Sequence, residues 1–226
     1  MKYDKQLDFF ISQNVDEQYA KFHSSLVPDT KIRGVRIPVL RKIAKEFTKY
    51  DDFLGNITLD NYEAISVACY YIGLTTKDLN TLKIRLNYIL PHINNWAVCD
   101  TFVSSLKLLK KKSVEFYPFL CEYLKSDNDF VCRFAIVCLM NYCLNDQTVN
   151  NIFEQVVPLQ GRSYYLDMAI AWLVSVAFVK DRTQTLKLLQ SKTLTKEVQN
   201  KSISKICDSF RVEEKDKFVV KKLRIK

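Results

Sequence analysis

Trp96 and Asp100 are two side chains that together could attract a cation. They lie four residues apart in the segment Asn-Asn-Trp-Ala-Val-Cys-Asp. A spacing of four places both on one face of a helix. There the indole ring offers cation–π attraction and the carboxylate offers a full negative charge, so the pair indicates a site for a cationic ligand. A purely structural interpretation stays open, in which Asn94 or Asn95 caps the helix and Trp96 is a core residue.

An arginine interrupts an apolar run further along the chain. Arg133 shares a helical face with Phe130, Ile136 and Val137. A guanidinium in such surroundings needs a partner, because an unpaired buried charge is very costly. The partner is either a carboxylate, in an internal salt bridge that supports the fold, or a phosphate or base of a ligand, since the planar guanidinium donates two parallel hydrogen bonds to phosphate.

The second tryptophan, Trp172, lies in the segment Ala-Ile-Ala-Trp-Leu-Val-Ser-Val-Ala-Phe, which is apolar nearly all round. Such a segment predicts a central, buried helix. A tryptophan in a helix of this kind is ordinarily a core residue, and only its relation to the other sites suggests more.

Helices must position these side chains, because 4 glycines and 5 prolines are too few for the turns of an all-β fold. Apolar residues recur at helical spacing along the whole chain, and Pro38 suits the start of a helix. The predicted helices cover residues 4–26, 38–47, 61–74, 78–90, 94–110, 114–125, 128–144, 147–157, 163–180, 182–190, 195–210 and 213–222.

The connections between these helices are short, which favours antiparallel helix pairs. Pairs that recur about every 35 to 40 residues are typical of an α-solenoid of HEAT type. With no linker or low-complexity segment, the sequence predicts an all-α fold in one domain, residues 1–226. The concave face of a solenoid suits an extended ligand such as a DNA duplex or a peptide.

Charge and missing motifs narrow the function classes. Lys and Arg outnumber Asp and Glu by 34 to 25, a net charge of +9 that favours an anionic partner. We find no phosphate-binding glycine loop, no HExxH and no cysteine–histidine cluster with metal-ligand spacing, and therefore expect no metal and no cofactor. The N-terminus lacks the features of a signal peptide, and the apolar run 168–179 is too short to span a bilayer. Seven cysteines without clustered spacing favour reduced thiols and a cytoplasmic protein.

Taken together, these motifs resemble the AlkD family of DNA alkylation repair glycosylases. Trp96 and Asp100 match the family's Trp-x-x-x-Asp helix motif. Arg133 matches its arginine before an Ala-Ile-rich stretch, and Trp172 ends a segment similar to its Ala-Ile-Gly-Trp. The order and the gaps between these motifs also agree. Weak resemblance extends over about residues 15–210, including a stretch similar to the family's Gly-Val-Arg-x-Pro-x-Leu-Arg, here Gly34-Val35-Arg36-Ile37-Pro38-Val39-Leu40-Arg41.

The resemblance implies a HEAT-like solenoid that holds double-stranded DNA and hydrolyses the N-glycosidic bond of cationic N3- and N7-alkylpurines, without metal, as a monomer away from membranes. It implies that Asp100 stabilises the positive charge that develops on the sugar and that Trp96 and Trp172 pack on the deoxyribose. It further implies that Arg133, Arg36 and Arg41 contact the DNA backbone.

Three positions depart from the family pattern. Ser175 replaces an arginine, Asp167 and Met168 replace residues that are often basic, and Ala97 replaces the aspartate of a Trp-Asp dipeptide. The first two changes remove positive charge, and each lost phosphate contact weakens DNA binding. Two alternatives to the glycosylase therefore stay open: a non-catalytic protein that binds DNA structure, and a helical-repeat scaffold for protein partners.

Overall fold

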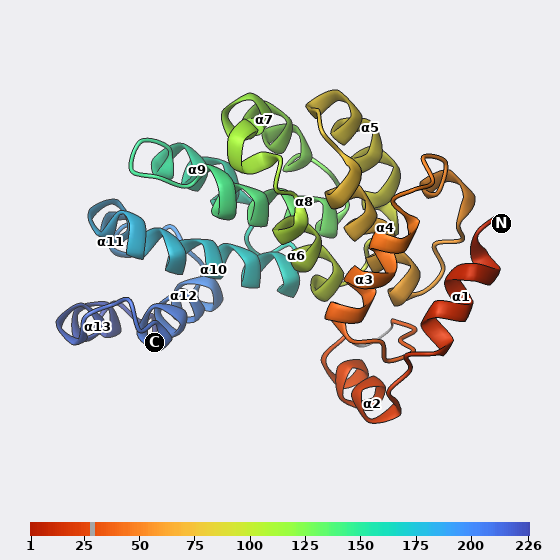
Figure 1. The fold of residues 1–226 in the computed structure, drawn as a ribbon. Helices are drawn as coiled ribbons and strands as arrows, with labels where there is room; N and C mark the ends of the chain where they lie inside the picture. The colour runs from red at the N-terminus through yellow and green to blue at the C-terminus, as the bar shows by residue number, and fades with distance from the viewer. Residues whose placement is uncertain (28–29) are drawn as a thin grey trace. The chain divides into compact units, whose positions relative to one another are not determined.

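The computed structural model describes residues 1–27 and 30–226, and these residues form α-helices and short helical turns without a β-strand (Figure 1). The all-α prediction is therefore confirmed. The chain divides into two compact units, Met1–Lys112 and Ser113–Lys226. The division falls at a kink inside α7 (Leu109–Tyr123), where Lys112 leaves the helical conformation with φ −121° and ψ 17°. A single domain over residues 1–226 stays a prediction.

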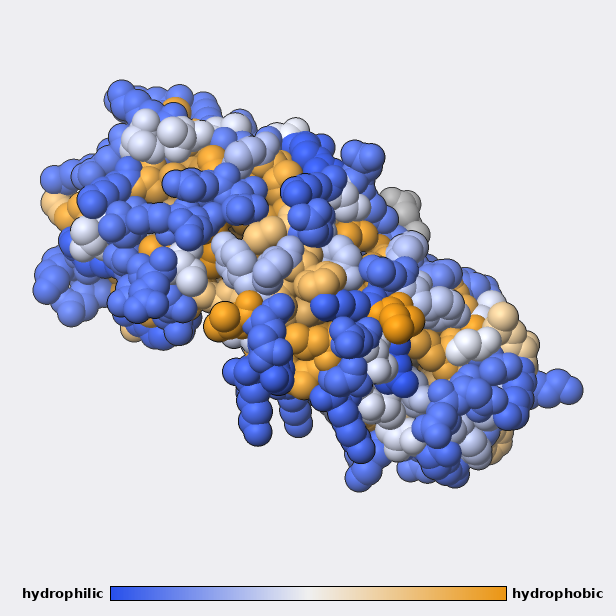
Figure 2. Space-filling view, turned by 90° about the horizontal axis from the view of Figure 1, so that it is seen from above, coloured by the Kyte–Doolittle hydropathy of each residue, from blue (hydrophilic) through white to orange (hydrophobic). Residues whose placement is uncertain are grey.

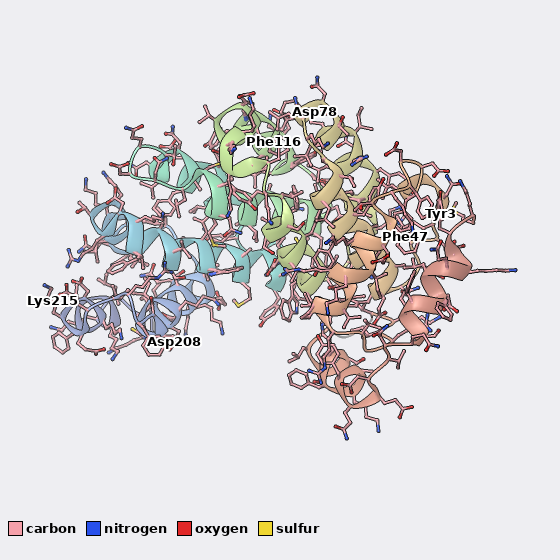
Figure 3. The ribbon with its side chains drawn as sticks, viewed as in Figure 1. Tyr3, Phe47, Asp78, Phe116, Asp208 and Lys215 are labelled. Carbon is pink, nitrogen blue, oxygen red and sulfur yellow. The ribbon has the colours of Figure 1, made fainter. Side chains whose placement is uncertain are left out.

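The first unit is organised around α4, whose residues from Tyr62 to Ile72 are all buried. Helix α4 packs against α3, α5 and α6. At the N-terminal end of the unit, the ring of Tyr3 meets Phe47 edge-on at 6.2 Å between centroids (Figure 3). The helices of this unit are α1 (Asp4–Ser12), α2 (Glu17–Leu26), α3 (Ile37–Phe47), α4 (Tyr62–Thr75), α5 (Leu79–Ile89) and α6 (Trp96–Ser105), with 3-10 turns at Leu54–Asn56 and Leu90–His92.

One predicted helix, 4–26, is wrong, because the segment forms two helices that are separated by residues 13–16. Asp16 adopts an extended conformation, and its side chain accepts a hydrogen bond from the Tyr19 N–H at 2.9 Å. Its own N–H donates to the carbonyl of Gly34. This local cap, fixed by a distant loop, outweighs an apolar periodicity that continues through the break.

The second unit is organised around α10, the predicted all-apolar helix, which packs against α8, α11 and α12. This layered packing agrees with the predicted HEAT-like helical repeat. The helices of this unit after α7 are α8 (Asp129–Cys138), α9 (Val149–Val156), α10 (Tyr164–Lys180), α11 (Arg182–Gln190), α12 (Lys196–Asp208) and α13 (Glu214–Lys221), with a short π-helix at Leu139–Cys143 and a 3-10 turn at Val157–Leu159.

Most predicted helix starts lie within two residues of the observed ones because polar caps mark them. The side chains of Asn61, Asp78, Asn95 and Ser163 each accept a hydrogen bond from the N–H three residues later. The predicted boundary between 94–110 and 114–125 is wrong: α6 ends at Ser105 and α7 begins at Leu109.

The surface in Figure 2 is largely hydrophilic, with apolar residues in separate patches. Of the helices that the structure describes, none combines the length and the apolar character that a bilayer crossing requires.

Candidate functional site

Trp96 and Asp100 lie where the sequence places them, at the first and fifth positions of α6. The side chain of Asn95 caps this helix, with its oxygen 2.9 Å from the Val98 nitrogen, so the capping interpretation is correct for Asn95. Trp96 and Asp100 are nevertheless only half-buried, whereas Ala97, which lies between them in sequence, is buried. The aromatic ring and the carboxyl group therefore share a face of α6 that ligands can reach.

The indole of Trp96 is tied to a helix that is far away in sequence. Its Nε1–H donates to the carbonyl oxygen of Leu26, the last residue of α2, at 3.2 Å. This bond fixes one edge of the ring and limits its rotation, which prepares the ring for stacking or cation–π contact.

A glycine lets α6 pack closely on α4. A Cβ atom on Gly73 would lie 2.5 Å from Oγ and 2.8 Å from the carbonyl oxygen of Ser105. Such distances are well inside van der Waals contact, so only glycine permits this approach. No local pattern singles out Gly73, because its partner Ser105 is about thirty residues away in the chain.

The Gly-Val-Arg stretch that precedes α3 is a structured loop. Gly34 has φ +96°, and a Cβ there would lie 2.4 Å from the carbonyl oxygen of Asp16. Oε1 of Glu63, a fully buried residue of α4, accepts hydrogen bonds from the N–H groups of Arg33, Gly34 and Val35 at 2.9, 2.9 and 3.3 Å. The glycine and valine of the motif thus have a structural role. Glu63 organises the loop from 29 residues away in the chain, so its role could not be predicted from the motif.

The two arginines of the same motif differ in their surroundings. Nη2 of Arg36 lies 2.8 Å from Oδ2 of Asp16, and its guanidinium sits 4.8 Å from the ring centre of Tyr19. With 61% of its side chain exposed, it still reaches solvent. The exposed Arg41 is 5.3 Å from the ring centre of Tyr70 and lines an open pocket. DNA contact by either arginine stays a prediction.

In the second unit, Arg133 is only 5% exposed and joins α8 to α10. Its Nη1 donates to the carbonyl oxygen of Tyr165 at 2.7 Å. The aromatic rings of Phe130 and Tyr165 reinforce this contact at 5.1 Å between centroids. Arg133 therefore supports the packing of the two helices, and its contact with DNA stays a prediction.

Trp172 is not a fully buried core residue, although most of α10 is buried. It is half-buried, together with Tyr165 and Met168, which lie on the same side of the helix at spacings of three and four residues. Trp172 thus belongs to one accessible strip on an otherwise buried helix.

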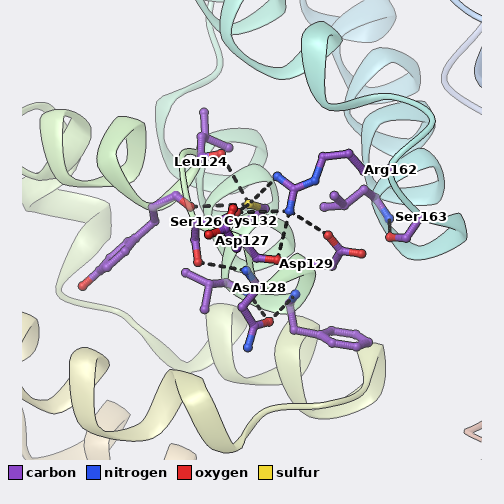
Figure 4. Close-up of polar contacts among 12 residues, drawn as sticks. Leu124, Ser126, Asp127, Asn128, Asp129, Cys132, Arg162 and Ser163 are labelled. Atoms are coloured by element: carbon purple, nitrogen blue, oxygen red, sulfur yellow. Dashed lines mark hydrogen bonds and ion pairs between the residues drawn. The ribbon is translucent and has the colours of Figure 1, made fainter.

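A second guanidinium organises the loop before α8 (Figure 4). Nη2 of Arg162 donates to the carbonyl oxygens of Ser126 and Asp127 at 3.1 and 3.2 Å and to Oδ1 of Asp129 at 2.9 Å. Its Nη1 lies 3.6 Å from the sulfur of Cys132. Arg162 lies two residues before α10 begins, so it fixes the start of α8 relative to α10. Because Asp129 is 33 residues away in the chain, no local pattern in the sequence identifies this role.

The departures from the family pattern have local explanations. The hydroxyl of Ser175 is buried and donates to the carbonyl of Trp172 at 2.7 Å. A carboxyl oxygen of Asp167 accepts a hydrogen bond from the Gly161 N–H at 2.8 Å. Ala97 belongs to the core, so the change at this position removes no side chain from the accessible face of α6.

The structure brings Trp96 together with Asp100 on α6, and places Arg133 and Trp172 on the packed helices α8 and α10. That all four meet at one site stays a prediction.

Within the described residues, no three His, Cys, Asp or Glu side chains are grouped as ligands for a metal ion. All seven cysteines lie within the described residues, and none of them forms a disulfide. Burial raises the pKa of the Cys143 thiol to about 12 and also raises those of Cys69 and Cys132, which makes these three thiols poor nucleophiles.

The comparison with known families agrees with these motifs. The family model of DNA alkylation repair enzymes matches residues 4–182, which include Trp96, Asp100, Arg133 and Trp172. No curated protein matches the chain. Because the family model covers well over half of the sequence, the chain belongs to the DNA alkylation repair enzyme family.

Proposed function

We propose that the protein is a DNA glycosylase that hydrolyses the N-glycosidic bond of cationic N3- and N7-alkylpurines in double-stranded DNA. Family membership supports a role in DNA alkylation repair. The observation that carries the finer proposal is the half-buried carboxyl group of Asp100, one helical turn from the tethered indole of Trp96.

The chemistry suits these residue types. An alkylated purine that already bears a positive charge is a good leaving group, so no general acid has to protonate it. As the glycosidic bond breaks, positive charge develops on the deoxyribose, and a nearby carboxylate stabilises it. In this proposal Asp100 supplies that carboxylate and orients the attacking water.

The remaining predicted residues bind the substrate. Trp96 and Trp172 pack on the deoxyribose and attract the cationic base through their rings. Arg36 and Arg41 contact backbone phosphates. The buried Arg133 holds α10, and with it Trp172, in addition to any contact with the phosphate beside the lesion.

A cytoplasmic location is part of the proposal, because cysteines that form no disulfide and are mostly buried suit a reducing compartment. The proposal also takes the protein to act as a monomer.

The test is release of 7-methylguanine and 3-methyladenine from methylated duplex DNA. We expect Asp100→Asn to lower the release rate at least about 100-fold, the size of effect that removal of one charge-stabilising group has in other enzymes. Asp208→Asn, at the exposed C-terminal end of α12, is the matched control and should release base at the wild-type rate. Thermal unfolding confirms that both variants fold. A wild-type protein that releases neither base contradicts the proposal.

A non-catalytic DNA-binding protein is the second candidate, because Ser175 and Asp167 bring no positive charge to positions where the family often has it. This candidate predicts salt-sensitive affinity for DNA without base release. Undetectable binding at low salt would exclude it.

A further inference from the structure

An open pocket of about 210 Å³ lies between α3, α4 and α6 of the first unit. Three cationic side chains, Arg41, Lys45 and Lys107, line it, and no carboxyl group does. Another open pocket of the same unit is lined by Asp4, Asp8 and Asp60 with a single arginine. A third pocket, in the second unit, has neither carboxyl groups nor cations in its lining. The first pocket thus differs from both in its three cations without a carboxyl group, a combination that favours an anion.

The pocket also contains an unused hydrogen-bond donor. Tyr70 is 2% exposed and lines the pocket, and among the described residues its hydroxyl has no hydrogen-bond partner. A buried hydroxyl without a partner costs free energy, typically about 1–3 kcal/mol, which a ligand oxygen would recover. Arg41 lies over the ring of the same tyrosine, so the guanidinium is already held at the pocket.

The pocket adjoins the candidate catalytic face. Ser104 lines it and follows Asp100 by four residues on α6, so the two lie about one helical turn, roughly 6 Å, apart along the helix axis. An anion in the pocket would therefore lie beside whatever faces Asp100.

We infer that this pocket binds a backbone phosphate of the DNA strand, next to the nucleotide whose sugar faces Asp100. The inference rests on the proposed function for the position of that sugar. Arg41, Lys45 and Lys107 neutralise the phosphate charge, and Tyr70 donates a hydrogen bond to a phosphate oxygen. The exposed lysines and the open shape suit a phosphate within a long polyanion. The same cations offset the repulsion between the DNA backbone and Asp100.

The first experiment measures the affinity for undamaged duplex DNA against salt concentration. Each of Lys45→Gln and Lys107→Gln should weaken binding and reduce the slope of log K against log salt by about 1, because each removes one phosphate-neutralising charge. Lys5→Gln, at an exposed lysine of α1 outside the pocket, should keep the wild-type slope. Wild-type slopes in both pocket variants would overturn the inference.

Tyr70→Phe tests the hydroxyl separately from the charges. We expect it to bind undamaged duplex about tenfold more weakly, as for loss of a hydrogen bond to a charged group, while its unfolding temperature does not fall. A hydroxyl with a merely structural role would give the opposite result, with lower stability and unchanged affinity.

Inorganic phosphate separates the two sources of the anion. Titration calorimetry shows whether inorganic phosphate alone binds and whether Lys107→Gln abolishes that binding. If both hold while Lys107→Gln leaves the salt dependence of DNA binding unchanged, the pocket binds a free anion and the inference fails. Because none of these measurements uses base release, the two proposals fail separately. If the wild type releases no alkylated base but the lysine variants show a smaller slope of log K for DNA against log salt, only the glycosylase assignment is contradicted.

Discussion

Glu63 in the first unit and Arg162 in the second perform the same task with opposite charge chemistry. One oxygen of Glu63 accepts three backbone N–H groups of the loop that leads into α3. One nitrogen of Arg162 donates to two backbone carbonyls and a carboxyl group around the loop that leads into α8. Each therefore orders the entry to a helix with a candidate DNA-binding arginine, Arg41 or Arg133.

The two differ in burial, and this difference decides what they contribute to stability. Glu63 is 0% exposed, so backbone groups that lost its oxygen would have no water to replace it. The side chain of Arg162 is 33% exposed, so water can partly replace it. The buried loop therefore depends on the Glu63 side chain, whereas the loop nearer the surface is only further stabilised by Arg162.

The largest expected effect is therefore at Glu63. Glu63→Ala leaves three backbone N–H groups of the Gly34 loop without an acceptor, and we expect unfolding free energy to fall by about 3 kcal/mol or more. Glu63→Gln keeps an accepting oxygen and should lose less than half as much. Chemical denaturation measures both. Equal losses in the two variants would show that the carboxyl group, and not its acceptor geometry, stabilises the loop.

A smaller effect is expected at Arg162. Arg162→Ala removes hydrogen bonds that water can partly replace, so we expect a loss of about 1–2 kcal/mol. Hydrogen exchange should locate this loss in residues 126–133, at the start of α8. The matched control is Arg182→Ala, which removes an ion pair with Asp216 on α13 and should leave exchange at α8 unchanged. A loss at Arg162 as large as at Glu63 would show that burial does not decide how much each side chain stabilises its loop.

Local signals made most of this fold predictable, and distant partners account for what was missed. Asn61, Asp78, Asn95 and Ser163 are helix caps that act three residues away, so the sequence marks those helix starts. The same locality brought Trp96 and Asp100 onto one face.

The roles of Glu63, Arg162 and Gly73 depend on contacts about thirty residues away. Glu63 follows Tyr62 in an apolar helix, and nothing near it in sequence identifies the three N–H groups that it holds. The break between α1 and α2 was missed for the same reason, because the Asp16 N–H bonds to the carbonyl of Gly34.

The smallest expected effect concerns pH, and it should appear only in the first unit, which contains both histidines of the chain. His23 is buried beside the rings of Tyr19 and Tyr62, at 5.2 and 4.7 Å between centroids, and burial lowers the pKa of its imidazole below 6.5. The unfolded chain therefore takes up a proton at a pH where the folded chain does not. Stability should fall as the pH drops from 7 through 6.5 toward the folded-state pKa, then level off.

One proton limits the slope of this fall to about 1.4 kcal/mol per pH unit. The stability of the wild type and of His23→Gln should be compared between pH 7 and 5.5, above the range in which carboxyl groups titrate. His92→Gln is the matched control, since His92 is exposed and its replacement should leave the slope intact. Hydrogen exchange should place the pH-dependent opening at α2 and α4, with no change at the Arg162 loop. An identical slope in His23→Gln would mean that a group other than His23 takes up the proton, so the acid sensitivity would not report on the packing of α2 against α4.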